Sequence, residues 1–103
     1  MKLTVKDRLN IGTFFPAESD LVTQILVKGI RDKVEVNSEE ANEINLKQQG
    51  TQLLWDTTKA KDKEITFNEA EIKFLKEQVT RLDQEKKINQ DNVDLCVAIQ
   101  EQK

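Results

Sequence analysis

Histidine and tyrosine are absent from this chain of 103 residues, and there is a single cysteine, Cys96. Without histidine, the sequence lacks the side chain that most often acts as a general base near neutral pH and that most often binds metals. One cysteine cannot form an intrachain disulfide. Cys96 lies in the apolar run LCVAI, so we interpret it as a small buried residue rather than a nucleophile. We therefore predict that the protein is not an enzyme and uses no cofactor.

Glycine and long apolar runs are also scarce. The three glycines, at positions 12, 29 and 50, do not cluster, which excludes the loops that cradle nucleotide phosphates. The longest apolar runs are far shorter than the roughly 20 residues that span a bilayer. The N-terminal segment MKLTVKDRLN lacks the apolar region of a signal peptide. We therefore expect a soluble intracellular protein with no membrane partner.

Charge of one sign is not in large excess, since 16 basic and 19 acidic residues give a net charge of −3. Residues 1–34 sum to +2 (6 basic minus 4 acidic), and the remainder therefore sums to −5. This asymmetry would help parts of the fold, or neighbouring copies of the chain, to attract each other. DNA-binding domains usually carry a stronger positive field, and basic residues such as Lys28, Arg31 and Lys33 at the end of a helix complement its dipole. We do not predict nucleic-acid binding.

Two pairs of acidic residues are spaced so that each pair lies on one face of a helix: Glu39 with Glu43, and Asp91 with Asp94. A site for Mg²⁺ or Ca²⁺ needs more oxygen ligands than two and usually a loop motif such as DxDxDG, which is missing. We interpret both pairs as solvated helix surface and predict no metal site.

Apolar spacing and capping residues predict four to five helices. Thr4 with Asp7 and Asn68 with Glu71 have the spacing of a capping box, in which two residues three apart cap a helix N-terminus. The expected helices cover residues 4–12, 19–34, 38–45, 69–85 and 90–100.

The second helix carries the clearest apolar pattern. Its apolar residues lie at i, i+1, i+4, i+5 and i+9, which predicts one continuous face for packing. These residues are Leu21, Val22, Ile25, Leu26 and Ile30. Gly29 lies inside this helix at a cost of about 1 kcal/mol relative to alanine, which suggests that another element approaches closely there.

A β-hairpin is expected at about residues 52–67, with strand 52–56 pairing with strand 63–67. Ile65 and Phe67 alternate with polar residues, as in a half-buried strand. A two-stranded hairpin is marginal by itself, so Trp55 is expected to pack it against the helices rather than to stack on a ligand. The sequence thus predicts an α+β fold, mainly α, in a single domain over residues 1–103.

Two apolar features point to an interface. Phe14 and Phe15 precede Pro16 in the most apolar loop of the chain, and we expect one ring in the core and the other available to a partner. The last helix has apolar residues on more than one face, including Val97 and Ile99, which is typical of a buried helix or of one that meets a second chain. The candidate interface residues are Phe14, Phe15, Lys28, Arg31, Val97 and Ile99.

Three stretches, KLTVKDRLNIGTFFPAESDLVTQILVKGI, LLWD with AKDKEITF, and RLDQEKKINQDNVDL, resemble small uncharacterised proteins of tailed bacteriophages and prophages. The resemblance covers most of the chain through its layout of elements. It implies a phage-encoded accessory or structural protein in the host cytoplasm or associated with the virion. It carries no catalytic residues with it.

Two functions of different classes follow. The first is a non-enzymatic protein that acts through protein–protein interaction or self-assembly, for example as a virion component or as an inhibitor of a host factor. The second is a protein that binds or sequesters a small nucleotide-type ligand. In that case Lys28 and Arg31 would contact phosphate, and Phe14 or Trp55 would stack on the base.

Overall fold

The computed structural model describes residues 1–102 and contains five α-helices, one short 3₁₀-helix and two small antiparallel sheets. The predicted class, α+β and mainly α, is confirmed. The elements in chain order are β1 (Lys2–Leu3), α1 (Val5–Ile11), η1 (Gly12–Phe14), α2 (Leu21–Val34), α3 (Ser38–Glu43), β2 (Lys47–Gln49), β3 (Gln52–Leu54), β4 (Lys63–Glu64), α4 (Glu69–Gln84) and α5 (Val93–Gln100).

The helices begin at the capping residues that the sequence indicated. Thr4 and Asp7 form a capping box at α1, in which each side chain accepts a hydrogen bond from the backbone N–H of the other. Asn68 and Glu71 form the same box at α4. The Asp20 side chain accepts a hydrogen bond from the backbone N–H three residues later and so caps α2. Local side-chain chemistry therefore sets where these helices start.

The last helix begins at Val93, three residues later than predicted. Asn89, directly before the predicted start at residue 90, makes hydrogen bonds of the capping kind: its side chain accepts from the backbone N–H of Asp91 and of Asn92. The Asn92 side chain accepts in return from the backbone N–H of Asn89. The cap thus closes a tight turn that leads directly into α5.

The strands pair differently from the predicted hairpin of residues 52–56 with 63–67. β3 pairs with β2, in the register Lys47↔Leu54, and β4 pairs with β1, in the register Lys2↔Glu64. The reason is the two-residue loop at Gly50, whose φ of 63° suits the first central position of a tight hairpin turn. This turn reverses the chain immediately before β3, which gives β3 a nearer partner.

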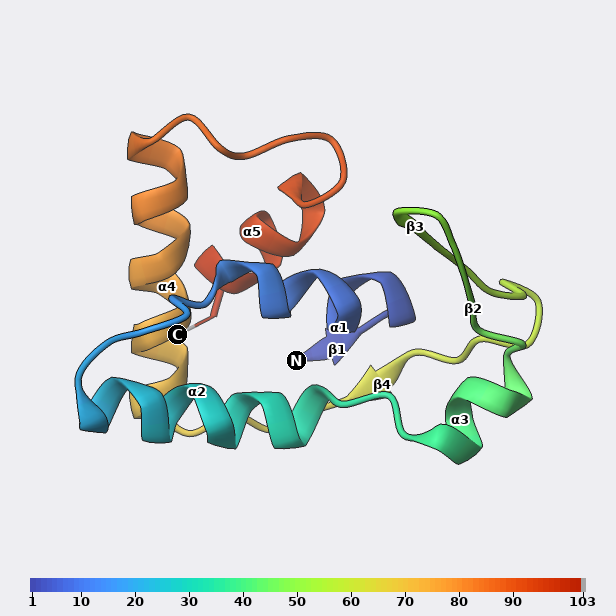
Figure 1. The fold of residues 1–103 in the computed structure, drawn as a ribbon. Coiled ribbons are helices and arrows are strands. Elements are labelled where there is room, and N and C mark those ends of the chain that lie inside the picture. Colours follow the sequence, from blue (N-terminus) through green and yellow to red (C-terminus); the bar gives the residue numbers. More distant parts are fainter. Residues whose placement is uncertain (103) are drawn as a thin grey trace.

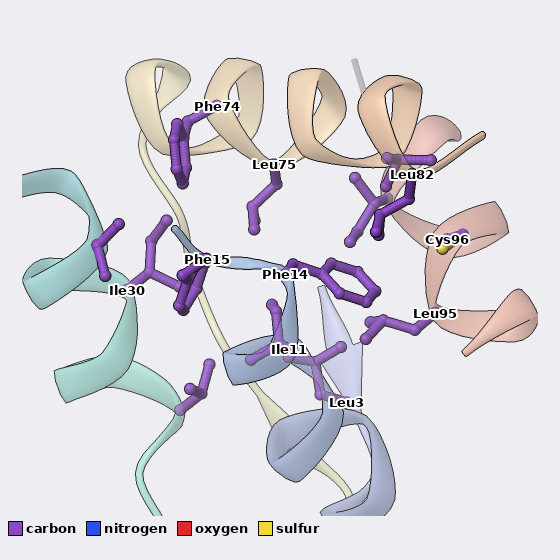
Figure 2. Packing of buried hydrophobic residues seen from close by; sticks show 14 of the residues in the cluster. Leu3, Ile11, Phe14, Phe15, Ile30, Phe74, Leu75, Leu82, Leu95 and Cys96 are labelled. Atoms are coloured by element: carbon purple, nitrogen blue, oxygen red, sulfur yellow. The ribbon is translucent and has the colours of Figure 1, made fainter. Parts of the chain in front are cut away.

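One hydrophobic core joins β1 and η1 with helices α1, α2, α4 and α5. Figure 2 shows Phe14, which is 0% exposed, between residues of α1, α4 and α5, while Phe15 lies beside Phe74 with ring centroids 6.1 Å apart. The other members of the buried cluster are Leu3, Ile11, Val27, Ile30, Val34, Ile65, Leu75, Val79, Leu82, Leu95, Cys96 and Ile99. Cys96 is confirmed as a buried core residue.

The molecule has two regions of different character. We call residues 1–36 and 63–102 the body, because every member of the core cluster comes from them. We call residues 37–62, which contain α3, β2 and β3, the arm. Figure 1 shows the β2–β3 hairpin projecting from the side of the body opposite α4. All six residues of its two strands are exposed.

Trp55 was predicted to pack the hairpin against the core, but it does not. It is half-buried in the arm and lies outside the core cluster. The expectation failed because it assumed that strand 52–56 pairs with 63–67, which would have brought Trp55 toward the helices. Ile65 and Phe67, by contrast, do pack against the core, as their alternation predicted.

Candidate functional site

The most exposed apolar group in the molecule lies on the first turns of α2. Leu21, Val22 and Ile25 are 76%, 68% and 61% exposed, and we call these three residues the α2 patch. Their spacing of i, i+1 and i+4 places them on one face of the helix. A side chain that stays in water forgoes roughly 1.5–3 kcal/mol of burial energy. A contiguous group of this kind marks an interaction site more often than chance exposure does.

The rotation of α2 about its axis explains why the patch faces outward. The inner face of α2 is buried and carries Val27, Ile30 and Val34. The apolar spacing had instead predicted that Leu21, Val22 and Ile25 share a buried face with Ile30. With 3.6 residues per turn, the two sets centre on nearly opposite sides of the helix. The core selected the second set and left the first in solvent.

Further along α2, Gly29 admits a close contact with α4. A Cβ at position 29 would lie 3.2 Å from Oε2 of Glu71 on α4. Glu71 is 3% exposed, and its Oε1 accepts hydrogen bonds from the Lys33 ammonium at 2.5 Å and from the backbone N–H of Asn68 at 2.9 Å. The prediction that Gly29 admits a close approach is therefore confirmed. The approaching group is a buried carboxylate with two partners.

A second apolar surface lies between α4 and α5. It is a groove of about 460 Å³, and we call it the α4–α5 groove. Its lining residues are Val79, Thr80, Asp83, Ile88, Val93, Cys96, Val97, Gln100 and Glu101. Val97, at 51% exposed, is the most exposed large apolar residue that lines the groove. Two carboxylates, Asp83 and Glu101, lie on the groove, and none of the described residues that line it is basic.

The six candidate interface residues divide into two groups. Phe14, Phe15 and Ile99 are at most 8% exposed and belong to the core, so they are not on the surface where a partner would bind. Both rings of the Phe14–Phe15 pair are buried, and the expectation that one of them faces a partner is corrected. Phe14 ends η1 and Phe15 follows it directly, and the core takes up both rings. Lys28, Arg31 and Val97 are exposed, and their role in an interface stays a prediction.

The surroundings of Arg31 also bear on the nucleotide hypothesis. Arg31 and Lys28 line a shallow cleft of about 340 Å³ beside Pro16. The Arg31 guanidinium lies over the Phe15 ring, 5.4 Å from its centroid. Phe14 is buried in the core and Trp55 belongs to the arm. Lys28 and Arg31 therefore line the same cleft, but neither Phe14 nor Trp55, which were expected to stack on a base, lies beside them.

The junction between body and arm is built around Arg8, which is 3% exposed. Its guanidinium donates to the backbone carbonyls of Val34 at 3.0 Å and Glu35 at 2.6 Å, and to both carboxylate oxygens of Glu40 at 2.5 and 2.9 Å. One side chain of α1 thus joins the end of α2 to α3. A buried charge with a two-pronged carboxylate partner is a strong and directional contact.

The same contact changes the acidity of Glu40. Hydrogen bonds from Arg8 hold the pKa of the Glu40 carboxyl below its usual value, and the nearby charge of Lys63 acts in the same direction. Partial burial opposes this shift. The sequence gives no local signal for this role of Arg8, because its partners lie 26 to 32 residues away.

Three further observations concern a cysteine nucleophile, a metal site and a membrane-spanning helix. Burial raises the pKa of the Cys96 thiol, which disfavours the reactive thiolate. Residues 1–102 contain no group of three or more His, Cys, Asp or Glu side chains placed to hold a metal ion. Within the same residues, none of the helices combines the length and the apolar character that crossing a membrane requires.

Comparison of the chain with protein-family models, with curated proteins and with solved structures gave no match. The resemblance to phage proteins therefore stays a prediction from the sequence.

Proposed function

We propose that this chain is a non-enzymatic interaction protein, which acts by binding another protein or a second copy of itself. The observation that carries the proposal is the α2 patch, where Leu21, Val22 and Ile25 are 61–76% exposed on adjacent turns of a well-capped helix. Three adjacent aliphatic side chains lie in water on this domain, so a partner that covers them forms a complex of lower free energy.

The contrast with the nucleotide hypothesis supports this choice. A nucleotide site needs a ring surface for the base and cations for the phosphate, and only the cations, Lys28 and Arg31, share a cleft. A thermal-shift series with nucleotides tests the alternative directly. A ligand at 100 times its dissociation constant adds about 2.7 kcal/mol of stability and raises the Tm.

The biological setting follows the resemblance to phage proteins and is part of the proposal. A small accessory or structural protein of a phage particle would use the patch for assembly. An inhibitor of a host factor would use it to cover a surface of that factor.

A pull-down from the native host with matched variants tests the proposal. The Leu21→Asp/Ile25→Asp variant places two carboxylates in the α2 patch, and we expect it to lose the partner that the wild-type chain retains. The Asn42→Asp/Gln90→Asp variant adds the same charge at two exposed polar positions away from the patch and serves as the control. Equal recovery of the partner by all three chains would overturn the proposal.

A further inference from the structure

The α2 patch and the α4–α5 groove have complementary chemistry. The groove is apolar, with Val93 and Val97 on its α5 side, and its charged residues are Asp83 and Glu101. The patch is also apolar. The acidic residues Glu18 and Asp20 precede it, and Lys28, three residues after Ile25, is exposed at its other end and forms no ion pair with the described residues. An apolar groove with two carboxylates thus exists on the same molecule as an apolar patch that ends in a lysine.

The two surfaces also match in length. At a rise of 1.5 Å per residue, the stretch of α2 from Leu21 to Lys28 is about 10 Å long. The α5 side of the groove, from Val93 to Gln100, has the same length of about 10 Å. The apolar part of α2 therefore has room along the groove, and Lys28 at one end comes within reach of a groove carboxylate.

A single copy cannot join its own patch to its own groove. α2 packs against α4 at the first turn of α4, where Gly29 meets Glu71. The groove starts at Val79, eight residues further along α4, which is about 12 Å. In Figure 1, α2 and α5 lie on opposite sides of α1. Both surfaces are therefore open at the same time, at separate places on one molecule.

We propose that the occupant of the α4–α5 groove is the α2 helix of a second copy of this chain. Leu21, Val22 and Ile25 of one copy cover Val97 of the next, and Lys28 pairs with Asp83 or Glu101. This inference rests on the proposed function and names its partner. Lys28 is available for this role, because it forms no ion pair with the described residues of its own chain, whereas four other basic residues of the first 34 do.

The proposed contact joins two different surfaces, so it is heterologous. Each copy in such a contact keeps one free patch or one free groove, and assembly continues until a ring closes or a filament grows. An isologous dimer, in which α2 meets α2, would instead stop at two copies. The small size of the two surfaces predicts self-association in the micromolar range rather than a permanent complex.

Two variants that each disable one surface test the proposal. Leu21→Asp/Ile25→Asp disables the patch, and Val97→Arg disables the groove while repelling Lys28. Both changes are at exposed positions, and circular dichroism checks that each variant folds. If Val97→Arg does not fold, Gln100→Arg on the exposed rim of the groove replaces it. Sedimentation velocity over the micromolar range then measures the assembly state of each chain and of their mixture.

We expect the wild-type chain to form species larger than a dimer, and each variant alone to weaken self-association at least about tenfold, which is 1.4 kcal/mol. The equimolar mixture should form a heterodimer and nothing larger, because one variant retains a working groove and the other a working patch. A wild-type chain that stays monomeric overturns the inference, and so does a mixture that stays monomeric while wild type assembles.

The two proposals fail in different ways. If wild type is monomeric but the Leu21→Asp/Ile25→Asp variant still loses its partner in the pull-down, the interaction function stands and self-assembly through the groove is wrong. If neither measurement responds to the patch variant, both proposals are overturned.

Discussion

The body and the arm of this molecule contain similar secondary structure but differ in what holds it together. The body buries a cluster of fifteen hydrophobic residues from six elements and their connections. Within the described arm, Ile44, at 2% exposed, is the one buried hydrophobic residue. The arm is fixed by polar contacts instead, chiefly the Arg8–Glu40 pair and the hydrogen bond from the Asp56 N–H to the Ile44 carbonyl at 2.7 Å.

This difference implies that stability is unevenly distributed. Regions with few buried apolar contacts open at lower free energy than the core does. We therefore expect the arm to open while the body remains folded, with the Arg8–Glu40 junction as the boundary between the two. The following predictions test this boundary, from the largest expected effect to the smallest.

The largest effect is expected in the centre of the body. Phe14→Ala removes a ring that is 0% exposed, and truncation of a buried Phe costs about 3–5 kcal/mol. That is a large part of the roughly 5–15 kcal/mol that stabilises a typical domain. Urea unfolding followed by circular dichroism measures the loss. Leu53→Ala in the exposed hairpin is the control and should change stability by less than about 0.5 kcal/mol. Equal midpoints for the two variants would contradict the division into body and arm.

The next effect is at the junction. Glu40→Gln leaves the Arg8 guanidinium buried without its carboxylate, which should cost about 3 kcal/mol, the lower end of the range for broken buried ion pairs. Glu39→Gln, at the exposed neighbouring position, is the control and should be as stable as wild type. Thermal unfolding of the three chains measures the difference.

The junction also predicts a pH dependence. The pKa of Glu40 is lowered in the folded state, so its stabilisation is complete above the usual glutamate pKa of about 4.3 and is lost as the pH falls through the lower folded value. Wild type should therefore lose more stability than Glu40→Gln over this acidic range. If the free energies of unfolding of the two chains changed in parallel with pH, protonation of Glu40 would not be coupled to folding.

A smaller effect is expected from Trp55→Ala. The side chain is half-buried in the arm, so we expect a cost of about 1–2 kcal/mol, below the 3–5 kcal/mol of a fully buried tryptophan. As the only tryptophan, it also reports on the arm through its fluorescence. The fluorescence transition in urea should come before the loss of helical circular dichroism. Coincident transitions would mean that arm and body unfold as one unit.

The smallest effect is expected at the hairpin turn. Gly50 has φ of 63°, where a side chain costs about 1 kcal/mol or slightly more. Gly50→Ala should speed hydrogen exchange of the β2–β3 amides and leave the body amides unchanged. Gly12→Ala is a matched control, because Gly12 has right-handed helical angles and open space around its Cβ position. If Gly50→Ala also speeds exchange of the body amides, or leaves the hairpin amides unaffected, the arm is not an independent unit.

The helices could be predicted from the sequence because their signals are local. Thr4 with Asp7 and Asn68 with Glu71 act over three residues, and the structure uses both pairs as caps. The strand partners could not be predicted in the same way, because β1 and β4 are separated by more than half of the chain. The β2–β3 hairpin had a readable signal, the glycine at position 50 between two glutamine-containing segments, but KQQ lacks the apolar alternation that marks a strand.

The candidate surface could be predicted only in part. Val97 and Ile99 both lie on the apolar last helix, yet one is 51% exposed and the other 0%. Apolar character on two faces of a helix does not tell which face the body covers. The same ambiguity concealed the α2 patch, since Leu21, Val22 and Ile25 have the spacing of core residues, whereas the body covers Val27, Ile30 and Val34.

The pairing of β1 with β4 has a consequence for synthesis on the ribosome. Lys2 pairs with Glu64, and 62 positions separate the two partners (64 minus 2). At a synthesis rate of about 5–20 residues per second, β1 waits roughly 3–12 s for its partner strand. During this interval Leu3, which is later 0% exposed, is unprotected. β1 is thus made several seconds before β4, and nascent-chain chaperones have this interval in which to bind it.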